Sequence, residues 1–169
     1  INIGLGTFIG SKQIDTKKIL SKLLPNIGIN YMEVKPKINR LRIWNGHFPL
    51  HGDGIVVIGD AASLCDPFLA EGLRPAIISG IEAAKSINSW LSKDCKDLKG
   101  YTENMRIKWG SSMYWGKKIA QVFYRFPKLG YKLGIKRPTA PKRIAEILSG
   151  EMGYGDIAQR VIRRLLVRN

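Results

Sequence analysis

One short stretch limits the possible folds more than any other. Residues 55–58 are four aliphatic side chains in a row, and Gly59 and Asp60 end the run. An unbroken apolar run of this length fits a strand that is buried on both faces of a parallel sheet. Such a strand needs parallel neighbours joined by crossover helices. The sequence contains no complete series of this kind, so we expect the neighbouring strands to come from residues outside this chain.

The rest of the sequence shows apolar patterns of two periods. Alternating apolar residues predict strands within residues 1–9 and 31–44, whereas spacings near 3.6 predict helices. The expected helices cover residues 16–24 (after the capping residue Asp15), 72–91, 101–126, 139–149 and 156–168. Prolines and glycines predict a loop over residues 127–138. The predicted fold class is therefore α/β, or α+β for the chain as it stands.

Composition excludes several classes of protein. The 169 residues suit one domain, and 44% hydrophobic residues are enough for a packed core. The two cysteines, Cys65 and Cys95, are too few for a disulfide framework and indicate a reducing compartment, so we expect a cytoplasmic protein. No apolar run approaches the roughly 20 residues that span a bilayer. Collagen-like, disulfide-stapled and membrane-spanning proteins are therefore excluded.

Positive charge is concentrated in the second half. The net charge is +15, with +2 in residues 1–84 and +13 in residues 85–169. Such a charge attracts phosphates, anionic lipid headgroups or nucleic acid, or it belongs to a solvated helical face. Aromatic residues are dense between 114 and 126, beside Lys117 and Lys118, which suits a peripheral contact with a membrane. No nucleic-acid-binding module is present, so we expect no nucleic-acid partner.

The apolar run leads into a segment with the features of a ligand site. Ligands of open α/β sheets bind at the carboxyl ends of strands, where Asp60 can accept hydrogen bonds from sugar or ribityl hydroxyls. Gly72 lets the backbone approach a flat ring or a phosphate. The helix expected after Gly72 presents free N–H groups and a positive dipole end.

This segment resembles the second FAD-binding motif of the geranylgeranyl reductase family, which belongs to the flavoprotein superfamily that includes the aromatic hydroxylases. The match consists of an apolar strand, Gly59-Asp60-Ala61-Ala62, Pro67 and Gly72, in that order. Similarity to the reductase branch extends to residues 2–6, 48–50 and 147–151 and to Tyr154. The resemblance implies the remnant of an FAD-binding Rossmann-like sheet, part of a β-sheet substrate domain and a helical C-terminal region.

The resemblance also assigns residues. Asp60 would contact the ribityl chain, Gly72 and Leu73 would lie against the isoalloxazine, and Pro67 would shape the loop. Arg74 and His47 are candidate substrate-binding residues, with a surface salt bridge as the alternative for Arg74. The cofactor-binding set is Gly59, Asp60, Ala61, Pro67, Gly72 and Leu73. No residue is assigned as the catalytic acid.

The family's reaction is hydrogenation of C=C bonds in a prenyl chain by hydride transfer from reduced FAD, with NAD(P)H or ferredoxin as electron donor. Two alternatives are a flavin-dependent monooxygenase or halogenase, and a non-catalytic fragment that binds membrane surfaces through its basic face. The expected domains are residues 1–53 (substrate-binding sheet), 54–95 (FAD motif) and 96–169 (basic helical region). Two departures are Ala70, where the family often has glycine, and Leu-Arg-Pro after Gly72.

The family's N-terminal Gly-x-Gly-x-x-Gly unit, which holds the ADP half of FAD, has no counterpart here. We therefore expect the chain to be the C-terminal part of a longer reductase, with the missing region supplied in cis or in trans. The Gly4-x-Gly6-x-x-x-Gly10 run imitates this fingerprint, but its last spacing is one residue too long.

Several polar residues near the motif have simpler interpretations. His47 and His51 are four apart, but Pro49 and Gly52 oppose a helix between them, so no metal site is expected. Cys65 is expected to be a small buried residue. Asp66 and Glu71 are expected to cap the loop, with proton delivery as the alternative.

Overall fold

The computed structural model describes residues 3–7, 14–46 and 48–166. The chain divides into two compact units, residues 1–40 and 41–169. The domain boundaries expected at residues 53 and 95 stay a prediction.

The first unit contains the short helix α1 (Thr16–Leu23). Asp15 caps it as predicted, because the Lys18 N–H donates to Asp15 Oδ1 at 3.0 Å. Two 3₁₀ turns follow, η1 (Leu24–Ile27) and η2 (Tyr31–Glu33).

The two N-terminal strand predictions are wrong where the structure describes them. Residues 3–7 have no regular structure, and the remainder of the predicted 1–9 strand lies outside the described residues. Residues 31–44 contain η2 and irregular backbone, with a single parallel bridge between Ile43 and Cys65. Alternation alone does not form a strand, because the backbone groups of a strand need a hydrogen-bonding neighbour.

The second unit begins with an antiparallel hairpin of β1 (His51–Gly52) and β2 (Ile55–Val56), joined by Asp53 and Gly54. This pairing corrects the prediction for residues 55–58, which were expected in a parallel sheet. Ile55 is 63% exposed, and Val57 and Ile58 are also exposed. The apolar run therefore has no covering layer within the described part of the chain.

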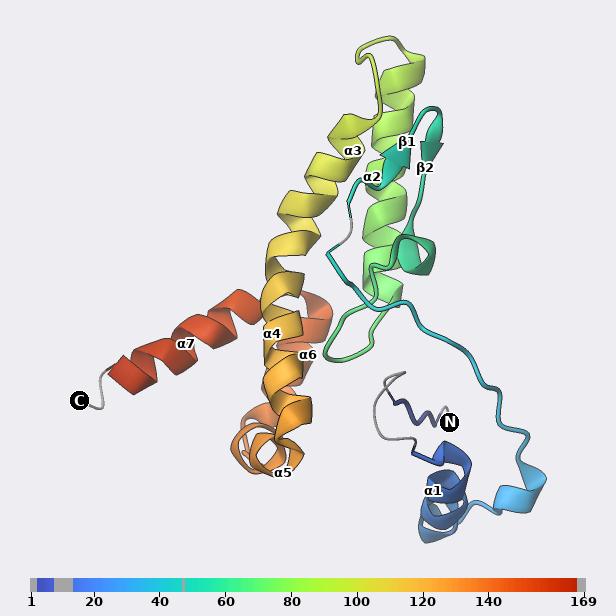
Figure 1. The fold of residues 1–169 in the computed structure, drawn as a ribbon, viewed down its shortest axis with the longest axis vertical. Coiled ribbons are helices and arrows are strands. Elements are labelled where there is room, and N and C mark those ends of the chain that lie inside the picture. Colours follow the sequence, from blue (N-terminus) through green and yellow to red (C-terminus); the bar gives the residue numbers. More distant parts are fainter. Residues whose placement is uncertain (1–2, 8–13, 47, 167–169) are drawn as a thin grey trace. The chain divides into compact units, whose positions relative to one another are not determined.

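Helices make up most of the second unit, so the α+β class is confirmed (Figure 1). The helix α2 (Leu73–Leu91) packs beside α3 (Lys99–Met105), which continues through the π-helical turn η4 (Arg106–Gly110) into α4 (Ser111–Arg125). The remaining elements are α5 (Pro127–Gly130), the π-helical turn η5 (Tyr131–Ile135), α6 (Ala140–Ser149) and α7 (Tyr154–Leu166).

The predicted loop at 127–138 is therefore wrong in part, because Pro127 starts a helical turn, a position where proline is favoured. The other C-terminal helices agree with the prediction within about two residues. Among the described residues, no helix has both the length and the apolarity that crossing a membrane requires.

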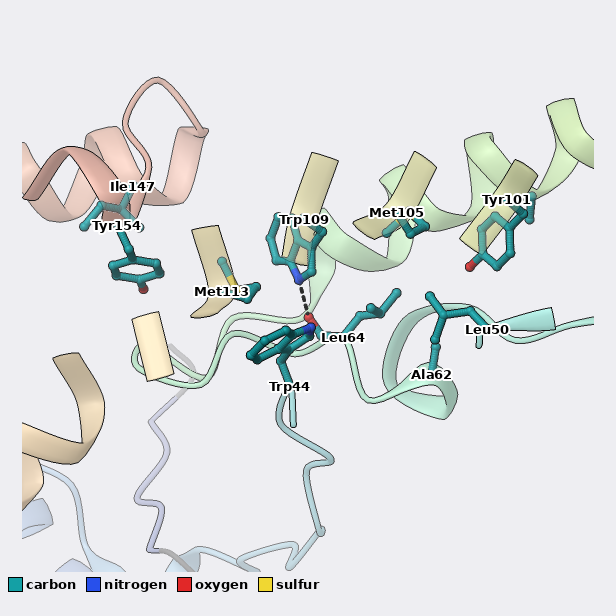
Figure 2. Close-up of a cluster of buried hydrophobic side chains, with 11 residues drawn as sticks. Trp44, Leu50, Ala62, Leu64, Tyr101, Met105, Trp109, Met113, Ile147 and Tyr154 are labelled. Atoms are coloured by element: carbon teal, nitrogen blue, oxygen red, sulfur yellow. Dashed lines mark hydrogen bonds between the residues drawn. The ribbon is translucent and has the colours of Figure 1, made fainter. Parts of the chain in front are cut away.

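The core of the second unit lies along one face of the α3–η4–α4 helix. Its residues recur every four positions as Tyr101, Met105, Trp109 and Met113, and all four are buried (Figure 2). Leu64 packs against this face, and the Trp109 Nε1–H donates to the Leu64 carbonyl at 3.0 Å. The loop after β2 is thereby fixed to the helix.

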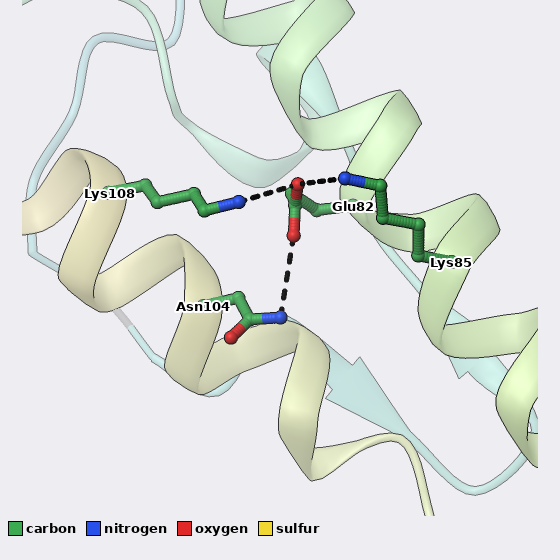
Figure 3. Close-up of polar contacts among 4 residues, drawn as sticks. All are labelled: Glu82, Lys85, Asn104 and Lys108. Atoms are coloured by element: carbon green, nitrogen blue, oxygen red, sulfur yellow. Dashed lines mark hydrogen bonds and ion pairs between the residues drawn. The ribbon is translucent and has the colours of Figure 1, made fainter.

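A buried carboxylate joins α2 to the α3–η4 helix. Glu82 of α2 accepts hydrogen bonds from Lys108 Nζ at 2.7 Å, Lys85 Nζ at 3.2 Å and Asn104 Nδ2 at 3.4 Å (Figure 3). Its side chain is almost fully buried, whereas both lysines are largely exposed. The hydrogen bond from Lys108 is the main reason that the pKa of Glu82 lies below its ordinary value.

Replacing Glu82 by glutamine is expected to lower the free energy of unfolding by about 1 to 2 kcal/mol at neutral pH. Because the pKa of Glu82 is lowered by folding, its contribution is fully present above the ordinary value of 4.5. It is lost as the pH falls through the lowered value. Urea unfolding should therefore show the difference between wild type and Glu82→Gln shrinking from about pH 6 to about pH 3. The control is Glu103→Gln at an exposed ion pair, which should change stability little. A difference that stayed constant with pH would contradict this role.

Candidate functional site

The segment singled out by the sequence forms a compact loop, residues 59–72, which we call the motif loop. It runs from the end of the β2 segment to the start of α2 and begins with the 3₁₀ turn η3 (Gly59–Ala62). Ser63 reverses the chain with a φ of +53°. Trp44 is hydrogen-bonded to the loop through its backbone N–H, which donates to the Cys65 carbonyl at 2.7 Å.

Asp60 and Gly72, twelve positions apart, meet at the start of α2. A Cβ atom on Gly72 would lie 3.0 Å from Asp60 Oδ1. Asp60 is exposed, so its carboxylate is open to a ligand while it lies against the Gly72 backbone. Gly72 is also the residue before the first turn of α2, where backbone N–H groups lack acceptors within the helix. The structure thus brings a hydrogen-bond acceptor and a helix N-terminus together.

Gly59 fixes the other end of the motif loop on α2. Its φ is +53°, and its N–H donates to Ser79 Oγ at 3.0 Å. A Cβ atom here would lie 3.2 Å from the Ala76 Cβ, so a larger residue would push the loop away from the helix. Glycine is needed at this position for both its backbone conformation and its lack of a side chain.

Asp66 caps the motif loop from inside, which confirms its predicted role. Its Oδ1 accepts from the N–H groups of Phe68 and Leu69 at 2.7 and 2.8 Å. Its Oδ2 accepts from the hydroxyl of Tyr154, the first residue of α7, at 2.6 Å. Burial, followed by the nearby Asp66 carboxylate, raises the pKa of Tyr154. The motif loop is thus tied to the C-terminal helix by a buried hydrogen bond.

Glu71 is also a capping residue, as predicted. Its Oε1 accepts from the Arg74 N–H at 2.8 Å, and its carbonyl accepts from the Asp66 N–H at 2.8 Å. Between these two acids, Ala70 has a φ of +55°. This backbone conformation favours glycine, which gives a physical reason for the glycine that the resembling family often has there.

Arg74 lies over an aromatic ring. Its guanidinium carbon is 5.4 Å from the centre of the Trp109 ring, and the group also packs against Gly150 after α6. The surface salt bridge considered as an alternative is not formed among the described residues. The guanidinium therefore holds the α6–α7 turn against α2, and its part in substrate binding stays a prediction.

The remaining predicted site residues differ in their surroundings. Pro67 is buried within the motif loop, whereas Ala61 is exposed and Leu73 is 72% exposed. Leu73 therefore presents both its side chain and its backbone N–H to solvent at the start of α2. His47 lies outside the described residues, so its predicted role is untouched. No cluster of three or more potential metal-ligating side chains occurs in the described part of the chain.

Cys65 is buried at 1% exposure beneath the motif loop, as expected for a small packing residue. Burial is the main cause, and Asp60, Asp66 and Glu71 are further causes, that raise the pKa of the Cys65 thiol to about 11. The thiolate, which is the reactive form, is therefore scarce at neutral pH. Cys95 is partly exposed and donates to the Asp97 carbonyl at 3.3 Å.

Native alkylation is expected to separate the two thiols. Iodoacetamide at neutral pH should label Cys95 and leave Cys65 unmodified, and both should react once the chain is unfolded in urea. Mass spectrometry of tryptic peptides measures the two extents of labelling. Equal labelling of both cysteines in the folded chain would show that the motif loop is not packed as described.

Two residues were not expected to support the site. Ser79, in the middle of α2, accepts the Gly59 N–H, and Tyr154 reaches Asp66 across 88 positions of sequence. Ser79 follows the small-residue pattern of α2, which indicates that a neighbouring segment approaches closely. No local signal pairs Tyr154 with Asp66.

Comparison with known proteins gives one distant relationship. A flavin-dependent halogenase of Armillaria mellea is 31% identical to this chain over 75 residues. The match covers 44% of this chain and 12% of the halogenase, so the chain spans a small part of that relative. No family model and no solved structure match the sequence. The comparison supports a flavoprotein-like relationship.

Proposed function

We propose that the motif loop and the start of α2 form the ribityl and isoalloxazine side of an FAD site in a flavin-dependent oxidoreductase similar to the geranylgeranyl reductases. The observation that carries the proposal is the exposed Asp60 carboxylate lying against Gly72 at the start of α2. Any side chain at Gly72 would enter the space beside that carboxylate, so the site depends on a bare backbone.

The residues present fit a flavin. Asp60 would accept hydrogen bonds from ribityl hydroxyls, and Gly72 and Leu73 would offer backbone to the ring. The positive end of the α2 dipole would stabilise negative charge on the flavin. When bound, the flavin supplies the redox chemistry, for which we propose reduction of prenyl C=C bonds with NAD(P)H or ferredoxin as electron donor. The chain's own residues hold and orient the cofactor.

A further region is needed to complete the site. The exposed side chains of Ile55, Val57 and Ile58 are suited to packing between a sheet and its covering helices. We propose that the region that binds the ADP half of FAD, supplied in cis or in trans, covers this run. The chain alone would then hold only part of the contacts to FAD.

The test is flavin binding by the chain alone and by the chain expressed with its upstream coding sequence. Absorbance bands of bound flavin are expected in the longer form, and Asp60→Asn should weaken FAD binding by about tenfold or more. The matched control is Asp94→Asn, which removes the same charge from an exposed position outside the motif loop. Flavin in neither form, or equal effects of the two substitutions, would overturn the proposal.

A second candidate activity is that of a flavin-dependent halogenase or monooxygenase. The relative's own description as a flavin-dependent halogenase is the observation that favours it. The two candidates differ in what reoxidises the reduced flavoprotein. A prenyl substrate should do so without oxygen in a reductase, whereas a halogenase or monooxygenase requires molecular oxygen. Anaerobic stopped-flow absorbance of the flavin-loaded protein separates them.

A further inference from the structure

The second unit contains an open pocket that the motif loop does not use. Its volume is about 730 Å³, within the range of small-molecule sites. The walls are the rings of Trp44, Phe48 and Tyr114, which lie beside the cations of Arg106, Lys117 and Lys118. The pocket thus joins flat apolar surface to concentrated positive charge.

Each cation lies over one of the aromatic walls. The Arg106 guanidinium is 5.2 Å from the Phe48 ring centre, Lys118 Nζ is 5.5 Å from that of Tyr114, and Lys117 Nζ is 6.0 Å from that of Trp44. No described carboxylate lines the pocket. The exposed Glu103 is 3.8 Å from Arg106, at the edge of ion-pair distance. The three positive charges are therefore weakly compensated by the protein.

Backbone contacts hold the walls in place. Trp44 is buried, and its N–H bond to the Cys65 carbonyl anchors it to the motif loop. Lys117 Nζ donates to the Asn45 carbonyl at 3.2 Å, which joins the two sides of the pocket. Gly110 lets the Phe48 ring approach the helix, because a Cβ atom there would lie 3.6 Å from Phe48 Cζ. A ligand would therefore meet a largely formed site.

We propose that this pocket binds an organic phosphate, a dianionic phosphate carried on a flat apolar body. Three cations match a doubly charged group better than a carboxylate, and both lysine and arginine bind phosphate oxygens well. The aromatic rings and glycines provide a surface on which an apolar body stacks. The inference does not depend on flavin binding, because no pocket residue belongs to the motif loop.

Phenyl phosphate is the probe for the shared chemistry. Two-dimensional ¹H–¹⁵N spectra of the full 169-residue chain should show its titration at the Trp44 indole and at the Gly46 and Gly110 amides. The Lys117→Gln/Lys118→Gln variant should weaken binding by about tenfold or more. The matched control, Lys132→Gln/Lys136→Gln, removes the same charge from exposed positions outside the pocket and should bind like wild type. Arg106→Gln provides an independent variant should the double substitution alter the native spectrum.

Further ligands separate the parts of the proposal. Benzyl alcohol tests the apolar body without charge, and inorganic phosphate tests the charge without the body. Either one binding as tightly as phenyl phosphate would overturn the proposal, as would equal weakening by the control variant.

Vesicles identify the source of the phosphate. Cosedimentation with phosphatidylcholine vesicles containing phosphatidic acid, reduced by Lys117→Gln/Lys118→Gln but not by the control, would support a lipid headgroup. Binding of phenyl phosphate without such cosedimentation would support a soluble ligand. If neither phenyl phosphate nor the anionic vesicles bound through these lysines, the proposal would be wrong.

Discussion

Replacing Asp66 by alanine is expected to lower the free energy of unfolding by about 3 kcal/mol. The change removes the acceptor of three hydrogen bonds, from the N–H groups of Phe68 and Leu69 and from the buried hydroxyl of Tyr154. Donors that lose their partner in a buried site keep the cost of their lost hydration. Urea unfolding followed by circular dichroism measures the loss.

A double-mutant cycle separates the parts of this effect. Tyr154→Phe removes one hydroxyl donor and should lower stability by about 1 to 2 kcal/mol. The combined Asp66→Ala/Tyr154→Phe variant should lose less than the sum of the single changes, because the two groups share a hydrogen bond. Strict additivity would mean that the bond between the motif loop and α7 contributes nothing to stability.

Replacing Trp109 by alanine is expected to lower the free energy of unfolding by about 3 to 5 kcal/mol. The ring is buried in the core, its Nε1–H bonds to the Leu64 carbonyl, and the Arg74 guanidinium lies over it. Its removal would leave a cavity at the junction of the motif loop, α2 and the long helix. Denaturant unfolding measures this loss too.

Two variants identify its cause. Trp109→Phe keeps an aromatic ring but removes the indole donor, so it should recover part of the loss. Trp115→Ala removes the same side chain from a position that is 39% exposed, and it should lower stability much less. A loss at Trp115 as large as that at Trp109 would contradict the placement of the core.

The helices were predictable because their signals are local. Gly72 before α2, Asp15 before α1 and the four-residue recurrence of Met105, Trp109 and Met113 lie within a few turns of the structure they specify. The capping roles of Asp66 and Glu71 were predictable for the same reason, since their acceptors bind N–H groups two or three residues away.

The strands could not be predicted in the same way. Residues 31–44 alternate in polarity, but a strand forms only where another segment accepts its hydrogen bonds. The hairpin at residues 51–56 did have a local signal, the Asp53-Gly54 pair, which favours a two-residue turn. The run at 55–58 outweighed that signal in the sequence analysis. Side-chain pairs such as Tyr154 and Asp66 depend on tertiary packing and leave no trace in local sequence.

The π-helical turn η4 sets how the long helix tolerates change in length. Residues 106–110 form one wide turn inside an otherwise α-helical stretch, with Met105 before it and Met113 after it on the same buried face. Deleting one residue from this turn would let the helix become regular. It would also rotate everything that follows by about 100° relative to α2. Gly116, which lies under the Tyr154 ring, would then turn away from α7. Insertions and deletions here are therefore expected to be far less acceptable than in the exposed turn at 92–97.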